Sequence, residues 1–521
     1  MEYIYLVLGL LSLFFIGYAP VYFLLPGKSG FKVGSRSMSS GAFLLFISFF
    51  IGALMTSWLF TMFSFFDIPF GTEIIYGVSA VFFIFYIYNF LSIRFRSGER
   101  KSLNRLDRDV LIARERSRPE SKKVLKNIEK EEPEKQEKQF DRRSRKSKMS
   151  QILFIFFIVL IVLNFLVVVF LTIIFPIRFW DAISCWSLKG QAFFIDGIIN
   201  NFYTVHDYGF SHPSYPIYLP LMQTWLLSWM GEINENFLKI LFPVFYSSLL
   251  FLLYYLFKQK LGKLLSILFV FLVSVLPVIV DHGYIEYANL LFSVVVLLAV
   301  YFFYLAMIMK GKTSYLIFSA IFFSITALTR SEGIIYVLMF IILNFIFFLC
   351  GLAVKYRLTK NLLNLFMPIA VFIIFLVPWY ILKLKLGIPL LSTEWVQFLN
   401  RDPSGAGMLD LGRAASVMGI QFLLSVWDST RAVFGSFYGP VWILLLVAMF
   451  FNLKRHFRKY NWIFFVFIFL GMVTIFISLA SIPDFANSTE RYILHLFPVS
   501  YYWIMTNSIG RELMERTEEY R

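Results

Sequence analysis

Charged residues and cysteine are both scarce in this sequence. Only 15% of its 521 residues are charged, whereas 59% are hydrophobic and 20% are aromatic. In soluble domains roughly a quarter of the residues are charged. The composition therefore excludes an ordinary soluble protein and indicates a polytopic membrane protein. The two cysteines, Cys185 and Cys350, are expected at different depths, which excludes a disulfide framework and a cysteine-based metal cluster.

Several functional signatures are also missing. The sequence has no G-x-x-x-x-G-K-[ST] phosphate loop and no recognisable soluble nucleotide-sugar domain, which argues against ATP-driven transport and against a nucleotide donor. The net charge of +16 resides mostly in short loops and one linker beside apolar runs, so it indicates orientation and anionic-lipid contact rather than nucleic acid. Because Glu2 stands where a signal peptide would be basic, the first apolar run is expected to be a retained span.

Long apolar runs dominate the rest of the chain. A span needs roughly 20 apolar residues to cross about 30 Å of hydrocarbon, and about thirteen stretches meet this requirement. We therefore predict an all-α polytopic membrane protein with about thirteen transmembrane helices. We divide it into a three-helix segment 1–93, a charged linker 94–149, a transmembrane core 150–510 and a tail 511–521.

The linker sets the expected orientation. It contains about 20 Lys and Arg and about 11 Asp and Glu without apolar periodicity, so we expect it to be disordered or loosely helical. Its positive charge predicts a cytoplasmic location, which puts the N-terminus and residues 177–235 outside and the C-terminal tail inside. The placement of the C-terminal tail inside assumes that the short apolar stretch 217–230, which contains Trp225, is interfacial. If this stretch crossed the membrane, every later loop would change sides. The expected location is the plasma membrane. The basic residues of later loops fall on the same cytoplasmic side: Lys258, Lys260, Lys263, Lys310, Lys312, Lys355, Arg357, Lys360, Lys454, Arg455, Arg458 and Lys459.

The outer side holds the unusual charges. Ionisable groups at membrane depth are costly, so by default they mark a functional site. We predict that these residues, from segments far apart in the sequence, converge in one extracytoplasmic pocket: Asp181, Glu286, Arg330, Glu332, Glu490 and Arg491.

The first of these segments is FWDAISCWSLKGQAFF, residues 179–194. If it is helical, Asp181, Cys185 and Lys189 share one face at intervals of four residues. A carboxylate beside apolar tryptophans could act as a general base, because partial desolvation raises its pKa. A helix cap is an equally good explanation of Asp181. Downstream, HPSYPIYLPL contains Tyr215 in a proline-rich approach to an apolar segment.

Three shorter motifs complete the set. In DHGYIEYANLLF, Glu286 and Asn289 stand where a span begins, and they could orient an acceptor, bind a cation or simply be polar helix ends. In LTRSEGII, Arg330 and Glu332 occupy a tight hairpin, which favours either a phosphate contact or a hairpin salt bridge. In STERYILHLFP, Arg491 suits bidentate phosphate binding or snorkelling to the interface. His495, from the same motif, is expected to be a packed histidine.

On these motifs, the chain from about residue 150 resembles the GT-C superfamily of polytopic glycosyltransferases. The resemblance is closest to the branch with protein O-mannosyltransferases and the aminoarabinose transferases that modify lipid A. Asp181 of WDAISCWSLKG stands where that family has an acidic catalytic motif, early in a long first extracytoplasmic loop that carries juxtamembrane helices. The stretch YPIYLPL (215–221), the hairpin TRSEG (329–333) and the pattern from Glu490 to Pro498 match further family features.

The chain also departs from the family pattern. Where relatives usually carry a second Asp, in a pattern like YADLP, this chain has Asn289 in YANLL. Ala182 stands where a second carboxylate could follow Asp181. Glu286 could substitute for the missing acid, or a metal role could be lost, so a divalent metal stays open and no other cofactor is expected. The first three spans show no resemblance to the GT-C family.

The resemblance implies a hexosyl or pentosyl transferase that moves a sugar from a polyprenyl-phosphate donor to an acceptor hydroxyl on the outer face. The acceptor could be a glycan, a lipid or a protein. Asp181 would be the general base of an inverting displacement, and the outer segment 383–436 would cover the site. The residues expected to bind the phosphate of the donor are Lys189, Arg330 and Arg491. Acceptor contact or site organisation is assigned to Tyr215, Glu286, Asn289 and Glu332.

Two other functions compete with this reading. A transporter or flippase for lipid-linked saccharides would also need intramembrane charge, but transporters tend to place it near the bilayer midplane, often within repeats, and no repeat is detectable here. A membrane scaffold that recruits lipid or protein through its linker would leave the outer charges unexplained.

Overall fold

The computed structural model describes residues 2–24, 31–33, 36–38, 41–91, 133–205, 209–309, 312–353, 358–390, 441–450, 453–458, 460–480, 491–508 and 510–514. Eight helices in this part of the chain are long and apolar enough to cross a membrane, and three apolar helices are shorter. The prediction of an all-α polytopic membrane protein is confirmed, whereas the expected total of about thirteen spans is not. A small antiparallel pair, β1 (Phe31–Val33) and β2 (Arg36–Met38), accompanies the helices.

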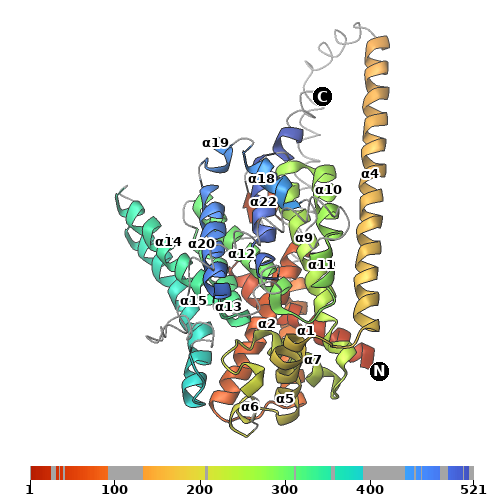
Figure 1. The fold of residues 1–521 in the computed structure, drawn as a ribbon. Helices are drawn as coiled ribbons and strands as arrows, with labels where there is room; N and C mark the ends of the chain where they lie inside the picture. The colour runs from red at the N-terminus through yellow and green to blue at the C-terminus, as the bar shows by residue number, and fades with distance from the viewer. Residues whose placement is uncertain are drawn as a thin grey trace, which may run out of the picture.

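The elements follow one another as in Figure 1. The long helices are α1 (Glu2–Leu24), α2 (Gly41–Phe65), the helix Thr72–Leu91, α4 (Pro133–Ile174), α9 (Leu241–Leu261), α12 (Ala288–Ile308), α14 (Gly333–Ala353) and α15 (Leu358–Lys385). The shorter ones are η2 (Ala182–Ser187), α5 (Leu188–Asp196), α6 (Asn200–Thr204), η3 (Gly209–Ser211), α7 (Tyr218–Met230), α8 (Glu235–Leu238), α10 (Lys263–Ser274), α11 (Pro277–Asp281), α13 (Thr313–Thr329), α18 (Val441–Phe450), α19 (Leu453–His456), α20 (Trp462–Ala480) and α22 (Phe497–Asn507).

Helix α12 is the centre of the bundle and α4 lies at its edge. Nearly all of α12 is buried, against α9, α13, α20 and α22, as expected for a helix that is apolar on every face. In contrast, only 6% of the apolar window of α4 is buried. Residues 133–149 of the predicted linker continue this helix. Residues 92–132 lie outside the described part, so the proposed division into domains stays a prediction.

The first two spans pack backbone to backbone. A Cβ added at Gly17 would lie 1.8 Å from the carbonyl oxygen of Ser48, and one added at Gly52 would lie 1.8 Å from that of Leu13. Only glycine permits such an approach, and small residues are the usual means by which membrane helices associate closely. Helices α1 and α2 are therefore tightly packed against each other.

Helix α7 is enclosed by protein. The stretch 217–230 was expected to be interfacial with Trp225 in an aromatic belt, and that placement of Trp225 is wrong. Trp225 is fully buried and its indole N–H donates to the Ser12 hydroxyl over 3.0 Å. The Tyr218 hydroxyl likewise donates to the carbonyl of Phe50 over 2.8 Å. The cause is the N-terminal segment, whose helices α1 and α2 cover α7 on the side away from α5.

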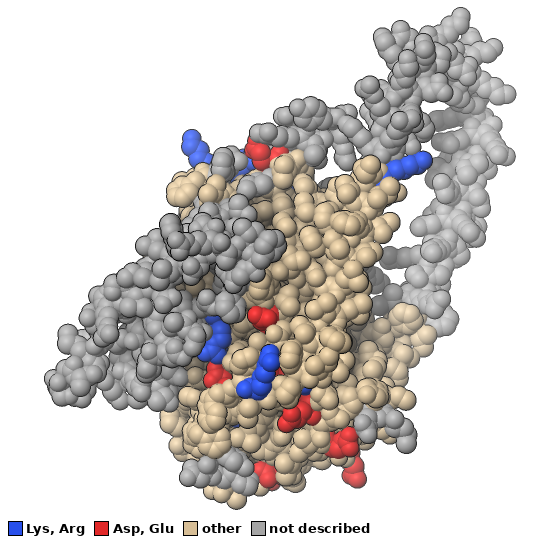
Figure 2. Space-filling view, turned by 45° about the vertical axis from the view of Figure 1, so that its right-hand side comes forward, with Lys and Arg blue, Asp and Glu red and all other residues tan. Residues whose placement is uncertain are grey.

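The two polar ends of the bundle lie apart. Figure 1 shows the N-terminal end of α4 and α19 at one end, and α5 and α6 at the other. Figure 2 shows a band of uncharged surface across one face, with charged side chains above and below it. This arrangement agrees with a multi-pass membrane protein whose linker and first loop face opposite sides. Which end faces the cytosol stays a prediction. Most of the covering segment 383–436, and Glu490, lie outside the described residues.

Candidate active site

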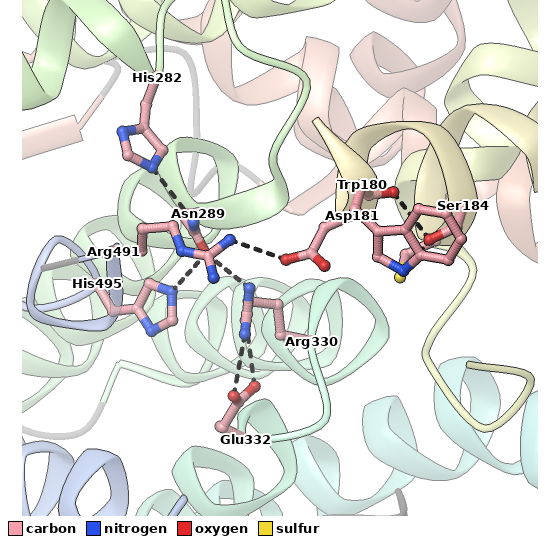
Figure 3. Close-up of polar contacts among 10 residues, drawn as sticks. Trp180, Asp181, Ser184, His282, Asn289, Arg330, Glu332, Arg491 and His495 are labelled. Carbon is pink, nitrogen blue, oxygen red and sulfur yellow. Dashed lines mark hydrogen bonds and ion pairs between the residues drawn. The ribbon is translucent and has the colours of Figure 1, made fainter. Parts of the chain in front are cut away.

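Asp181 forms an ion pair with Arg491. Its Oδ2 lies 2.8 Å from Nη1 of Arg491, although 310 residues separate the two in the sequence. Asp181 has helical backbone angles at the start of η2, and its side chain makes no capping hydrogen bond. Figure 3 shows its carboxylate pointing toward Arg491. A π-helical turn, which often occurs at functional sites, follows directly.

The pair is partly accessible. The side chain of Asp181 is 42% exposed and that of Arg491 is 26% exposed. The Arg491 guanidinium also lies 4.9 Å from the centre of the Tyr287 ring. The guanidinium is thus held by an aromatic face and a carboxylate, which replaces the expectation of simple snorkelling. Both charged groups can be reached by a substrate.

Asn289 is the hub of a buried polar network. A guanidinium has only donors, so the amide oxygen must face Arg330, whose Nη1 donates to it over 2.6 Å. The same oxygen lies 3.1 Å from Nε2 of His495, which therefore carries a proton. The amide nitrogen lies 3.3 Å from Nε2 of His282, which accepts. His282 then donates from Nδ1 to the carbonyl of Val278 over 2.9 Å. An asparagine satisfies all three neighbours without a net charge (Figure 3).

The Arg330 hairpin contains a bidentate salt bridge. Nε and Nη2 of Arg330 donate to the two carboxylate oxygens of Glu332 over 3.2 and 3.1 Å. Burial by itself raises the pKa of Glu332, but the guanidinium outweighs it and holds that pKa below its usual value. Gly333 is required at the turn because a Cβ there would lie 2.2 Å from the carbonyl oxygen of Thr326. Three donors of Arg330 are therefore committed to Glu332 and Asn289.

Lys189 and Tyr215 lie together, with Nζ of Lys189 5.9 Å from the centre of the Tyr215 ring. Lys189 is completely buried, and its Nζ donates to the carbonyl of His212 over 2.8 Å. Burial lowers its pKa to about 7. The ring of His212 stacks on Tyr215 at 4.8 Å, and His212 adopts a left-handed φ of 50°, which is uncommon outside glycine. Lys189 thus fastens the loop before α7 to α5. Burial also raises the pKa of the neighbouring Cys185 thiol to about 11, so this thiol is unreactive.

Glu286 belongs to a different group. It is almost completely buried, and the charges that act on it are those of Lys239, Glu235 and Arg178. Burial raises its pKa to about 7. The hydrogen bonds described for Asn289 go to Arg330, His282 and His495 and not to Glu286, so the placement of Glu286 does not support a substitute for the missing second carboxylate. Among the described residues, no group of three or more His, Cys, Asp or Glu could hold a metal ion.

Sequence reasoning missed two members of the network. His282 stands seven residues before Asn289 in the same motif, and His495 was expected only to pack. His495 does pack, 4.4 Å from the Phe292 ring, but it also bonds Asn289. The available signal was the cost of burying an asparagine, because a buried amide must find partners.

Comparison with known proteins identifies the central part of the chain. Residues 218–381 match the family described as dolichyl-phosphate-mannose-protein mannosyltransferase, which is a GT-C type glycosyltransferase domain. The match includes Asn289 and the Arg330 hairpin, whereas Asp181 and Arg491 lie on either side of it. No curated protein and no solved structure matches the chain. The resemblance to this family is confirmed, and at the family's general level the match supports a membrane glycosyltransferase with a lipid-linked sugar donor.

Proposed function

We propose that this protein transfers a sugar from a polyprenyl-phosphate donor to an acceptor hydroxyl on the extracytoplasmic side, with Asp181 as the general base. One observation carries the proposal. A partly exposed carboxylate and a partly exposed guanidinium, from opposite ends of the core, form an ion pair beside the GT-C type domain.

The chemistry assigns one role to each partner. The phosphate of the donor is already a good leaving group, whereas an acceptor hydroxyl is a weak nucleophile. Asp181 takes the hydroxyl proton as the oxygen bonds to the anomeric carbon. The bond from that carbon to the phosphate oxygen breaks, and its electrons leave with the phosphate. A single displacement of this kind inverts the anomeric configuration.

Arg491 is the best placed cation for the departing phosphate. A guanidinium has five N–H donors in a planar fork, so Arg491 can hold Asp181 and a phosphate oxygen at the same time. Its donors would stabilise the negative charge that develops as the bond breaks. Of the three cations predicted to bind phosphate, Lys189 is enclosed, and the side chain of Arg330 is only 11% exposed and gives three donors to Glu332 and Asn289. We therefore assign those two to positioning.

The position of the site favours transfer over transport. Asn289 is the second residue of α12, so the network lies at one end of a membrane-length helix. Transporters typically bind near the midplane. A site at the end of the bundle can receive a lipid-linked donor from the membrane and an acceptor from the aqueous side.

The experiment is an Asp181→Asn variant in cells that lack the natural protein. Loss of a general base reduces transfer by about 10²- to 10⁴-fold. We expect the glycosylated product to disappear and the lipid-linked sugar to accumulate, as measured by mass spectrometry. Glu232→Gln, a change at an exposed acid, is the matched control and should leave both unchanged. Normal product from a well-expressed Asp181→Asn protein would refute the proposed role of the carboxylate.

A further inference from the structure

A second polar cavity lies at the other end of the bundle. Its volume is about 450 Å³, within the range of roughly 300–1,000 Å³ that small-ligand sites occupy. Four basic residues line it: Lys260, Arg455, Arg458 and Arg511. They come from the end of α9, from α19 and the turn after it, and from the helical turn 510–514. None of the described lining residues is Asp or Glu.

The wall of the cavity is an ordered hydrogen-bond chain. The Tyr304 hydroxyl donates to Oδ1 of Asn461 over 3.0 Å, and Nδ2 of Asn461 donates to Oδ1 of Asn507 over 2.9 Å. Nδ2 of Asn461 also lies 3.1 Å from the carbonyl oxygen of Arg455, which fixes the start of the turn. Three separate helices are thereby held around the cavity. A wall of this kind is preorganised rather than assembled by chance from loose side chains.

Lys260 is aimed into the same space. Its Nζ lies 5.2 Å and 5.4 Å from the ring centres of Tyr304 and Tyr502, and it donates to the Tyr304 hydroxyl over 3.4 Å. The positive charge of Arg511 acts on it unfavourably. Like charges brought together beside a cavity are relieved when an anion enters between them.

Membrane orientation alone does not explain this arrangement. The positive-inside preference requires basic residues on the cytoplasmic side, but it does not require them to meet around a cavity. Lys454 shows the difference, because it lies on α19 beside Arg455 and is exposed without lining the cavity.

The cavity is remote from Asp181. Ile308, which lines it, ends the helix on which Asn289 begins, and at 1.5 Å per residue the two are about 28 Å apart. That is about the thickness of the hydrocarbon core. The two sites thus face opposite sides of a membrane.

We propose that this basic pocket is a second binding site, for a phosphate group, on the face of the membrane opposite the Asp181 pair. A guanidinium such as that of the exposed Arg458 can bind phosphate oxygens bidentately, and the other basic residues add positive charge around the cavity. The phosphate could belong to an anionic lipid headgroup at the rim of the bundle or to a soluble phosphate compound. Both ligands would present the same phosphate oxygens to the pocket, and an experiment can tell the two ligands apart.

The test uses the full chain in nanodiscs and follows thermal unfolding by tryptophan fluorescence. One arm replaces part of the phosphatidylcholine with phosphatidylglycerol, and the other adds pyrophosphate to phosphatidylcholine nanodiscs at constant ionic strength. The variant is Arg458→Gln, at an exposed lining residue whose loss should not prevent folding. Lys454→Gln is the matched control, with the same change of charge on α19.

We expect at least one anion to raise the Tm of the natural sequence by several degrees. Arg458→Gln should lose at least half of that rise, and Lys454→Gln should retain it. A rise with phosphatidylglycerol alone identifies a lipid headgroup, and a rise with pyrophosphate alone identifies a soluble ligand. The proposal is overturned if neither anion raises Tm, if Arg458→Gln keeps the full rise, or if both variants lose it equally.

Discussion

The two polar ends of this bundle treat their cations in opposite ways. At the Asp181 end, each guanidinium lies beside an acid: Arg491 beside Asp181, and Arg330 beside Glu332. At the other end, four basic residues surround a cavity whose described lining contains no acid. Each of these two ion pairs is neutral as a unit and can respond when a substrate competes for its partners. The described lining of the second cavity carries four basic side chains, which suits it to hold an anion.

The largest effect is expected from breaking the ion pair. Arg491→Met removes the partner of Asp181 and the proposed phosphate ligand, so transfer should fall by about 10²- to 10³-fold. Arg491→Lys keeps the charge but loses the fork, and its loss should be smaller. The measurement is product formed per amount of protein in membranes of known donor content. If Arg491→Met transfers sugar at the natural rate, the two ends do not differ as we describe.

The Asn289 hub should be the most sensitive point for stability at the same end. Asn289→Leu deprives Arg330, His282 and His495 of a buried partner, and such losses cost about 1–3 kcal/mol each for an unsatisfied group. We expect a fall in Tm of several degrees in detergent or nanodiscs. Asn289→Asp keeps the oxygen that faces Arg330 and should fall less. An unchanged Tm in Asn289→Leu would show that the network does not hold these helices together.

Glu286 should make the stability of the Asp181 end depend on pH. Burial raises its pKa to about 7 in the folded protein, from an ordinary value near 4.5. The folded state therefore holds this proton more tightly. The resulting stabilisation, on the order of 3 kcal/mol, is complete below about pH 4.5 and is lost as the pH rises through about 7.

Glu286→Gln carries no such proton. We expect the Tm of the natural sequence to fall relative to that of the variant between about pH 5 and pH 8. Unfolding of both proteins across that range gives the measurement, and Glu232→Gln, at an exposed acid whose charge does not act on Glu286, is the control. Parallel pH profiles for the natural protein and Glu286→Gln would contradict the assignment.

The smallest effect is expected at the basic end. Tyr304→Phe removes one hydroxyl that donates to Asn461 and accepts from Lys260, which should cost about 1 kcal/mol. Tyr254→Phe, on α9 beneath Lys258 and outside the cavity, is the matched control and should cost less. The measurement is Tm in the absence of added anions. Equal changes in the two variants would show that the wall of the cavity is not preorganised by this tyrosine.

Much of the fold and part of the site could be predicted from the sequence. The positions of the first three spans depend on local hydrophobicity alone, and the structure places helices at Tyr3–Leu24, Phe43–Phe65 and Thr72–Leu91. The convergence of Asp181 and Arg491 was predicted from the cost of charge at membrane depth, because such groups need a partner. The catalytic and binding roles of these residues remain predictions.

The sequence by itself determined that this chain is a helical membrane protein with a few buried charges, because span length and the cost of burying charge are properties of short segments. Only the tertiary structure decided the partners. It joined Arg491 to Asp181, committed Arg330 to Glu332 and Asn289, and separated Glu286 from both. The reason is physical: α12 is apolar on every face, so its sequence does not say which neighbour each face meets. The enclosure of α7 by the N-terminal helices was likewise invisible, since glycine contacts between α1 and α2 leave no hydrophobic signal.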